Sequence, residues 1–410
     1  MKSICILGGG VHVLTFVKLL ADQIDDRELG IRIVARDLRR LDAIGTSCVA
    51  VLAGHRPDWE ILTTADRAAG LDGADVVMGM IRVGGLAARC HDESFPAEID
   101  QIGDEGIGLG GISNTWRTLP FMETLRADIA ARAPSATVLN LTAPLATTTR
   151  CLTEQGMSTW GVCELPYTSQ RALGPSAKTM TYGGLNHLGW FCPANDVEWA
   201  AIEHAVSAGN ADRATVERFG ALPLHYYYRL FDPAAATRLD RAFVPGRAQA
   251  LGELVAEAEQ EMREHPSNGA PTLARRKTPW FDHALVPITS ALLGYSTHRA
   301  FANASMSTFS ETPFPAETVV ETRASWCDTG ASADPFPRLP GKVTDFLLAV
   351  ATSDDLAYRA AMERDTTLLR KALEALPLEM RSREVEYAVK QIVAGGNMGA
   401  PDRSEPEVDT

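Results

Sequence analysis

This chain of 410 residues lacks several features, and each absence excludes a class of protein. No stretch of about 18 consecutive apolar residues occurs, so we expect no membrane-spanning helix. Lys and Arg number 39 against 52 Asp and Glu, which argues against a nucleic-acid-binding protein, because such proteins need clustered positive charge. The seven cysteines form no CxxC pair, so we expect no structural zinc site.

The start of the chain and its cysteines bear on the compartment. Lys2 and Ser3 lead directly into a β-branched segment with no small-residue cleavage pattern, so we expect no signal peptide. The odd number and scattered positions of the cysteines fit a reducing environment. We therefore expect a cytoplasmic globular protein that binds neither membranes nor nucleic acids. A small phosphorylated ligand remains compatible with the charge, because it needs only local positive groups.

What the sequence does contain begins with the pattern of a dinucleotide-binding unit. Residues 4–7 predict a buried strand, a glycine turn follows, and apolar residues at helical spacing begin at residue 13. A second strand over 31–35 leads to an acidic residue that would accept hydrogen bonds from ribose hydroxyls, which favours NAD+ over NADP+, although Arg36 leaves NADP+ open. The alternative is a turn that binds nothing. The expected cofactor contacts are Gly8, Gly9, Gly10, Val11 and Asp37.

Two polar, glycine-rich runs follow the apolar segment 74–80, and we expect them to border an active site. They cover residues 81–93 and 102–111 and contain arginines, acids and paired glycines. Ligands bind beyond the carboxyl ends of parallel strands, and long loops in compact domains are usually functional. The runs therefore predict backbone brought close to a polar ligand, with an irregular solvated loop as the alternative.

The rest of the chain completes an α/β pattern. Further strands are predicted over 76–80, 137–141 and 160–163, and a strand with a turn over 182–190. Helical periodicity covers 248–263, 342–351 and 356–376. We predict a Rossmann domain with a doubly wound parallel sheet over 1–165, a mixed α/β (α+β) domain over 166–396, and a disordered tail over 397–410.

Taken in order, several motifs resemble those of the NAD- and metal-dependent family 4 glycoside hydrolases, which include 6-phospho-glucosidases and α-glucosidases. The resemblance implies a Rossmann domain followed by a domain that supplies much of the substrate pocket and the dimer contacts, and hence a homo-oligomer (a dimer or tetramer). The matching motifs lie at residues 6–10, 82–93, 102–111, 117–120, 140–144, 161–166, 184–188, 368–370 and 376–378.

The resemblance also implies an unusual reaction. In that family, which does not use the common pair of carboxylates, NAD+ removes hydride from C3 of the sugar. The resulting ketone makes the C2 proton acidic, a base removes it, and a divalent metal stabilises the enediolate. The C1 substituent then leaves, water adds and the hydride returns. The implied cofactors are NAD+ and a divalent metal, with Mn2+ favoured, and the implied partner is a small sugar or glycoside.

Two residues match the metal ligands of the family. Cys163 lies in its Gly-x-Cys motif, and His187 lies in its Gly-Leu-Asn-His motif. A thiolate and a neutral imidazole would leave open positions for substrate oxygens. Taken alone, each residue has an ordinary explanation, since a lone cysteine is often a small buried hydrophobe and a lone histidine a satisfied core residue.

Other positions carry over as cofactor or substrate contacts. Asn140 matches an asparagine at a strand end beside the nicotinamide and the substrate, and Asn186 would bond a sugar hydroxyl. Arg247, with the basic run 275–277, would bind a phosphate or carboxylate, although solvated surface charge is the alternative. We thus predict Arg82 and Asn140 at the cofactor, and Arg89, Glu105, Asn140, Asn186 and Arg247 at the substrate.

The chain departs from the family at positions that bear on the substrate and the base. Val11 and His12 replace a serine pair that helps seat the substrate and its phosphate, and Ala143 replaces an asparagine. Glu164 follows the metal cysteine where the family has Asp or Asn. The tyrosine base has no clean match, because Leu224 occupies its expected place. Tyr226, Tyr227 and Asp240 remain open as substitutes, with packing the commoner role of tyrosine clusters; the catalytic residues predicted are Glu164, Tyr227 and Asp240.

These patterns favour an NAD+- and Mn2+-dependent glycosidase-like enzyme acting on a glycoside that need not be phosphorylated. One alternative is an NAD-dependent sugar dehydrogenase or epimerase that keeps the oxidation and does not cleave the glycosidic bond. Another is an inactive protein that binds NAD or a sugar as a sensor.

Overall fold

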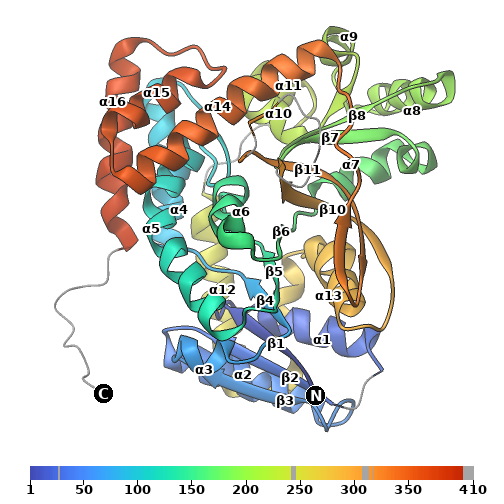
Figure 1. Cartoon of the computed structure of the whole chain (residues 1–410), viewed down its shortest axis with the longest axis vertical. Coiled ribbons are helices and arrows are strands. Elements are labelled where there is room, and N and C mark those ends of the chain that lie inside the picture. Colours follow the sequence, from blue (N-terminus) through green and yellow to red (C-terminus); the bar gives the residue numbers. More distant parts are fainter. Residues whose placement is uncertain (26–27, 242–245, 307–313, 316, 400–410) are drawn as a thin grey trace.

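The structure is a computed structural model of the chain (Figure 1). It describes residues 1–25, 28–241, 246–306, 314–315 and 317–399. Among these residues, no helix is both long enough and apolar enough to cross a membrane.

Parallel strands form the N-terminal half of one continuous sheet. Strand β1 lies inside it and is apolar on both faces: Ile4 and Ile6 face one core, and Cys5 and Leu7 face the other. A strand buried on both sides reads as a continuous apolar run, which is what the sequence has here. The order across the sheet is that of a doubly wound dinucleotide-binding fold, so the predicted fold class is confirmed. That order is β3 (Glu60–Thr64), β2 (Leu29–Val34), β1 (Lys2–Leu7), β4 (Val76–Gly79), β5 (Thr137–Asn140) and β6 (Thr159–Gly161).

The sheet does not stop at β6. Strand β10 pairs antiparallel with β6 at one position, Asn303 opposite Gly161, and carries the sheet into the C-terminal half. Because hydrogen bonding is continuous across this point, the two predicted domains share a sheet; the boundary at residue 165 stays a prediction. The remaining strands are β10 (His298–Ser305), β11 (Val319–Cys327), β7 (Thr181–Leu185), β8 (Leu188–Cys192), β9 (Leu222–Pro223) and, beside β11, β12 (Gly330–Ala333).

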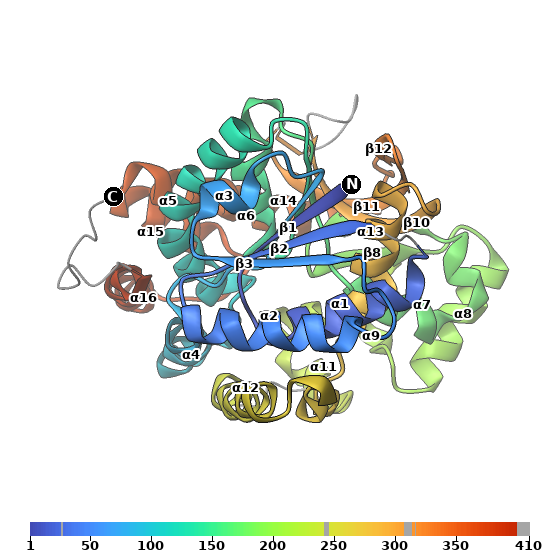
Figure 2. The ribbon, with the colours of Figure 1, turned by 90° about the horizontal axis from the view of Figure 1, so that it is seen from below.

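Helices cover both faces of the parallel half, as Figure 2 shows from below. Helices α1 and α2 pack on one face together with α12 and α13, and α3, α5 and α6 pack on the other with the C-terminal helices. The two faces correspond to the two separate hydrophobic cores. The bounds are α1 (Val13–Gln23), α2 (Leu38–Leu52), α12 (Arg247–Glu264), α13 (Val286–Leu292), α3 (Arg67–Leu71), α5 (Gly108–Arg132) and α6 (Leu145–Thr153).

The polar runs differ from the prediction, because most of their residues are helical. Residues 85–94 form α4 (Gly85–Ser94), and the second run ends inside α5. Asp92 is fully buried and receives hydrogen bonds of 3.1 and 2.5 Å from the guanidinium of Arg117. Ion pairing thus permits burial of a segment whose composition indicated a loop. The loops that remain are short, over 80–84 and 102–107.

The C-terminal helices also differ in one boundary. Helix α14 (Gly341–Glu363) is continuous where a break near 352–355 was expected. The chain turns instead at Arg364, whose φ of 56° is left-handed, and Asp365 caps α15 (Thr366–Ala375). Helix α16 (Ser382–Gly395) follows, and a 3-10 turn covers Gly396–Gly399. Positions 400–410 lie outside the described residues, and the disordered tail over 397–410 stays a prediction.

Shorter helices surround the strands of the C-terminal half, at the upper right of Figure 1. They are α7 (Leu165–Leu173), α8 (Asp196–Ser207), α9 (Arg213–Phe219), α10 (His225–Phe231) and α11 (Pro233–Arg238). Single helical turns lie at Phe95–Ile99, Glu154–Gly156, Pro175–Lys178, Pro266–Asn268, Pro271–Arg275 and, as a π turn, Phe281–Leu285.

Candidate functional site

The glycine turn after β1 has the geometry of a phosphate-approach site. Gly8 has a φ of 115°, and a Cβ there would lie 2.3 Å from the carbonyl oxygen of Met80. A Cβ on Gly9 would lie 2.7 Å from Ala35, whereas one on Gly10 would meet nothing within 4 Å. The turn is therefore packed against β2 and β4 and open at its tip, where helix α1 begins. Helix N-termini of this kind bind phosphate through free backbone N–H groups.

Two predicted cofactor contacts near this turn differ in their exposure to solvent. Val11 is 1% exposed and its side chain belongs to the core, so only its backbone remains for a ligand. Asp37 is exposed just beyond the end of β2, where a ribose contact was expected. One of its carboxylate oxygens caps α2 by accepting a bond of 3.0 Å from the Arg40 N–H. The other oxygen has no such role, so the position remains compatible with ribose recognition.

A histidine and a tyrosine lie face to face where the C-terminal half meets the second polar loop. His187 forms the β7–β8 turn with a φ of 67°, and its ring centroid lies 4.4 Å from that of Tyr226, with the planes at 34°. Nδ1 of His187 is buried and has no hydrogen-bond partner within the described part of the chain. A Cβ on Gly106 would lie 3.2 Å from this nitrogen, so the imidazole packs closely against the backbone of the loop.

Electrostatics favour the neutral form of this imidazole. Burial lowers the pKa of His187 to about 4, against the opposing charge of Glu105. A neutral imidazole is the form that binds a metal ion. The orphaned nitrogen shows that the described protein groups leave part of the hydrogen-bonding capacity of the ring unused.

Cys163 follows β6 and belongs to the same cluster. Burial raises the pKa of its thiol, the charge of Glu321 raises it further, and a hydrogen bond from the Asn186 side chain opposes this. A negative charge on Cys163 in turn contributes to a raised pKa of Tyr226, where the main cause is burial, and both side chains pack against the same hydrophobic core. A bound cation would remove the thiol proton, because a coordinating thiol is deprotonated.

Cys163 and His187 thus have the chemistry of two ligands for a divalent metal, and two ligands are too few to fill its coordination shell. Among the described residues, no group of three or more His, Cys, Asp or Glu could hold an ion by itself. A thiol and an imidazole from the protein would leave the remaining positions to ligand oxygens. This is the arrangement of a site that binds substrate on the metal rather than a closed structural site.

The arginines of the first polar run are tied to acids. Glu105 accepts two bonds of 2.9 Å from Arg82 and lies 3.2 Å from Arg89, which also pairs with Glu93 at 2.8 Å. Burial alone would raise the pKa of Glu105, but the two arginines outweigh it and the pKa is lowered. These three predicted residues are therefore brought together, and with Glu93 the two positive charges meet two negative ones.

A second basic group beside them is less fully compensated. Burial, together with the charges of Arg89, Arg82 and Arg247, lowers the pKa of Arg276 to about 10, against the opposing charge of Glu105. Within the described residues, no carboxylate forms an ion pair with Arg276, and its guanidinium lies 4.8 Å over the ring of Trp280. The region therefore has a surplus of positive charge that a small anion would neutralise.

His12 completes this basic group. It is 9% exposed, both ring nitrogens are buried without partners among the described residues, and its ring contacts Trp280 edge-on at 6.4 Å. Burial lowers the pKa of His12 to about 4, with a further contribution from Arg276. Two unpartnered nitrogens at the start of α1 mark a place where a ligand would supply the missing hydrogen bonds.

Comparison with known proteins shows a similarity over part of the chain. Residues 3–177, less than half of the chain, match the sequence model of the family 4 glycosyl hydrolases. The chain is 29% identical over 208 residues to a maltose-6'-phosphate glucosidase of Bacillus subtilis, covering 48% of this chain and 46% of that protein. It is also 29% identical over 206 residues to a 6-phospho-alpha-glucosidase of Leptotrichia buccalis, covering 47% of each. The chain spans about half the length of the curated relatives it matches.

Solved structures with the family 4 fold extend the likeness to almost the whole chain. A 6-phospho-beta-glucosidase of Thermotoga maritima superposes with a TM-score of 0.82 at 19% identity, covering 97% of this chain and 99% of that one. A 6-phospho-alpha-glucosidase from gut microorganisms, solved in complex with NAD and Mn2+, gives 0.79 at 19% identity, covering 96% and 97%. At this identity the likeness concerns the fold.

Three residues predicted from the family 4 resemblance do not reach the centre of the site. Tyr227 is 3% exposed and packs in an aromatic core, with ring centroids 5.2 Å from Trp190 and 5.3 Å from Phe346. Its neighbour on α10 faces the site instead, because successive helical residues point about 100° apart. Asp240 is exposed in a left-handed turn with a φ of 51°. Neither residue has the surroundings of a catalytic base.

Asn140 is the third predicted residue that does not reach the centre of the site. It is fully buried; its amide donates bonds of 2.9 Å to Thr148 and to Thr149 and accepts one of 3.1 Å from the Thr142 N–H. Both donor hydrogens are used inside the protein, so the side chain braces the loop after β5 rather than contacting a ligand.

Other predicted residues lie at the edge of the cluster. Glu164 follows Cys163 and accepts a bond of 3.1 Å from Thr168; burial raises the pKa of its carboxyl. Arg247 is exposed at the first residue of α12, and its charge reaches Tyr226 and Arg276. Asn186 is 4% exposed and directed at Glu321 rather than at solvent.

Four residues of this region were not predicted from the sequence: Asp104, Arg229, Glu321 and Asp354. Arg229 lies over the Tyr226 ring at 4.8 Å, and its Nε and Nη1 are buried without partners in the described part of the chain. An acid inside an apolar strand, as at Glu321, is the one pattern that could have drawn attention beforehand.

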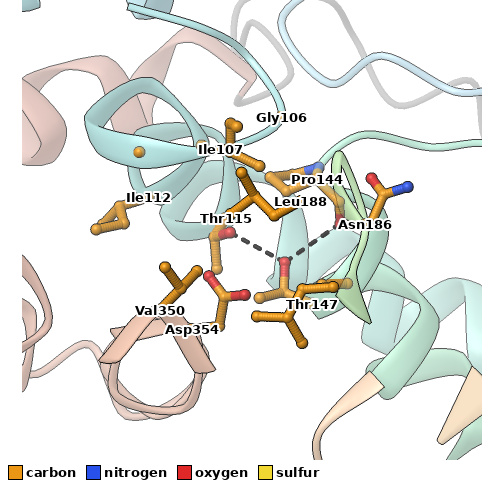
Figure 3. A pocket seen from close by; sticks show the side chains of 14 residues that line it. Gly106, Ile107, Ile112, Thr115, Pro144, Thr147, Asn186, Leu188, Val350 and Asp354 are labelled. Atoms are coloured by element: carbon orange, nitrogen blue, oxygen red, sulfur yellow. Dashed lines mark hydrogen bonds between the residues drawn. The ribbon is translucent and has the colours of Figure 1, made fainter. Parts of the chain in front are cut away.

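A small cavity lies directly behind the loop that carries Gly106 (Figure 3). It has room for about one water molecule. Figure 3 shows the carboxylate of Asp354 from α14 near Thr115 and Thr147, whose hydroxyls are 3.0 Å apart. Burial raises the pKa of Asp354 to about 7, against the opposing charge of Arg150. The cavity is also bordered by Asn186, so it touches the back of the site.

Proposed function

We propose that this protein is an NAD+- and divalent-metal-dependent glycosidase acting on a glycoside that carries a phosphate or a similar small anionic group. The observation that carries this proposal is the contact of His187 with Tyr226 beside the hydrophobic core against which Cys163 also packs. Three residues distant in sequence thus provide a soft ligand, a neutral imidazole and a phenol.

The two cofactors are assigned to separate parts of this region. We assign NAD+ to the turn at Gly8–Gly10 with its ribose at Asp37, and the metal to Cys163 and His187. When bound, NAD+ supplies a hydride acceptor, and the metal supplies Lewis acidity at adjacent substrate oxygens.

Tyr226 is the residue we assign to proton transfer at C2. Burial and the charge of Asp104 raise the pKa of its phenol, while Arg229 over the ring and Arg247 oppose this. A positive charge added at Cys163 and His187 would lower the same pKa further, since it stabilises the phenolate. Tyr226 therefore becomes a base only in the loaded site, which limits proton removal to bound substrate.

His12 and Arg276 are assigned to the anionic group of the substrate. A guanidinium suits a phosphate or carboxylate, and a neutral imidazole donates one hydrogen bond to it. Relatives named as acting on 6-phosphorylated glucosides support this choice. His12 in place of serine changes the donor at this position, so we expect an anion-bearing sugar different in size or position from that of those relatives.

The test is an assay with α- and β-linked p-nitrophenyl 6-phosphoglucosides and their unphosphorylated counterparts. Protein freed of metal by chelation and of nucleotide by gel filtration should be inactive, and NAD+ with Mn2+ together should restore release of p-nitrophenol. In D2O the sugar product should carry deuterium at C2. Net NADH accumulation without p-nitrophenol would instead identify a dehydrogenase, and no dependence on either cofactor would refute the proposal.

A further inference from the structure

A row of four residues crosses the sheet between the strands that deliver Cys163 and His187. Gly161 of β6 is paired with Asn303 of β10, Asn303 with Glu321 of β11, and Glu321 with Gly184 of β7. Cys163 comes two residues after the first member of the row, and Asn186 two residues after the last. The polar pair in the middle is therefore flanked on both sides by the segments that carry the proposed metal ligands.

Glycine at the first position of the row makes room for the polar pair. A Cβ on Gly161 would lie 2.8 Å from the Cβ of Asn303. At the other end, Gly184 lies against the returning β8, where a Cβ would be 2.5 Å from the Leu188 carbonyl oxygen. The close approach of these strands fixes the positions of Asn303 and Glu321 relative to both ends.

Glu321 is fully buried and is held only by neutral donors. Its Oε1 accepts bonds of 2.9 Å from the amide of Asn303 and 3.3 Å from that of Asn186, and its other oxygen accepts a bond from the Tyr182 hydroxyl. Among the described residues, no cation forms an ion pair with it. A buried carboxyl without a cation costs stability, so its retention between two ligand-bearing segments calls for a functional reason.

The amide of Asn186 connects Glu321 to the thiol. An asparagine amide has two N–H donors. One is directed at Glu321, and Asn186 is near enough to Cys163 to oppose the rise in the pKa of its thiol. Because the carboxyl accepts only from the nitrogen, it fixes where the donor end of the amide lies. Asn186 is also followed directly by His187, so holding its side chain restrains the left-handed turn that presents the imidazole.

We propose that Glu321 is a positioning residue for the metal site: it holds Asn186 so that the second N–H meets the Cys163 sulfur and His187 stays opposite it. This inference rests on the proposed function, since it takes Cys163 and His187 as metal ligands. A hydrogen bond to the sulfur stabilises the thiolate and orients it toward the ion, and outer groups of this kind commonly alter metal affinity about 10–100-fold.

The test measures metal binding without turnover. Co2+ replaces Mn2+, because a cobalt–thiolate bond gives a charge-transfer absorption band that reports on the sulfur itself. Glu321→Met keeps roughly the side-chain size and removes both acceptor oxygens, so neither asparagine amide keeps its partner; Glu321→Gln would not do this, because one oxygen already accepts from both amides. We expect Glu321→Met to weaken Co2+ binding by about 10-fold or more and to reduce or shift the band. The matched control is Thr322→Val, which removes a buried hydroxyl from the adjacent position of β11 and should change neither.

A double-mutant cycle shows whether the effect passes through Asn186. If it does, Asn186→Ala weakens Co2+ binding by a similar factor, and the double variant is no worse than either single variant. Additive losses, or a Glu321→Met band and affinity within twofold of the Thr322→Val control, would overturn the inference. If Glu321→Met does not fold, Tyr182→Phe decides in its place. It removes one donor to Glu321 without touching Asn186 and should weaken binding by a smaller factor, and an unchanged affinity would count against the proposal. A wild-type protein with no cobalt–thiolate band would refute the metal site itself, which is a different failure.

Discussion

The imidazole of His187 lies over the phenol ring of Tyr226, with the ring centroids 4.4 Å apart and the planes at 34°. This contact joins the β7–β8 turn to α10 and places one of three consecutive tyrosines in the site. The other two, Tyr227 and Tyr228, are buried in the core of the C-terminal half. Of the three neighbouring tyrosines, Tyr226 therefore lies in the site, while Tyr227 and Tyr228 serve packing.

Replacing the tyrosine in the site should abolish proton transfer. We expect Tyr226→Phe to lower kcat by about 10²–10⁴-fold, the usual contribution of a positioned acid or base, with little change in the free energy of unfolding. Tyr227→Phe is the matched control on the same helix and should retain activity, because the ring remains packed against Trp190 and Phe346. Steady-state kinetics and urea unfolding of both variants test this. Equal losses in the two variants would contradict the assignment.

Removing the guanidinium of Arg276 should raise KM more for a negatively charged substrate than for an uncharged one. We expect Arg276→Ala to raise KM for a phosphorylated glycoside by about 10–100-fold, because a hydrogen bond to a charged group contributes about 1.5–3 kcal/mol. The unphosphorylated analogue should respond much less. Arg275→Ala is the control, since Arg275 is exposed and pairs with Glu257 at 2.5 Å on the surface. A similar rise in KM for both substrates would show that Arg276 does not recognise the anion.

The half-buried acid that lines the cavity, Asp354, predicts a pH-dependent stability. Burial raises the pKa of Asp354 from 3.8 to about 7, so the folded state holds this proton more tightly than the unfolded state does. Its destabilising contribution is absent below about pH 4, grows as the pH rises to 7 and is constant above that. Asp354→Asn should therefore match wild type at pH 4 and be about 1–3 kcal/mol more stable at pH 8. Urea unfolding at several pH values measures this, and a difference independent of pH would exclude the proposed cause.

The ion pair inside the first polar run should be important for folding. Arg117 and Asp92 are 1% and 0% exposed, and removing one partner leaves the other charge buried. We expect Asp92→Ala to cost about 3–5 kcal/mol of unfolding free energy. Arg213→Ala breaks the exposed pair with Glu203 and should have little effect, because solvent screens such pairs. If the urea midpoints of the two variants decreased by the same amount, burial of the Asp92 pair would add no stability beyond that of an exposed pair.

The sequence by itself determined the parallel half of the fold and predicted where a site would lie. Short apolar runs such as residues 4–7, bounded by a glycine turn, are typical of strands buried on two faces, and a glycine turn with a helix and an acid after it is typical of a dinucleotide unit. Those patterns are local, so they can be recognised from the sequence alone. The motifs around Cys163 and His187 were likewise visible, and the prediction that the two are metal ligands remains to be tested.

Only the tertiary structure decided which residues face the site and which support it. Sequence spacing could not tell Tyr226 from Tyr227, because α10 presents one to His187 and the other to the core. It could not show that Asn140 uses both amide hydrogens internally, or that Arg89 and Glu105 neutralise each other. It gave no reason to connect Glu321 with Cys163, since that relation exists only through the pairing of β6, β10, β11 and β7. Side-chain direction and cross-strand register depend on contacts between distant segments, and these are set when the sheet assembles.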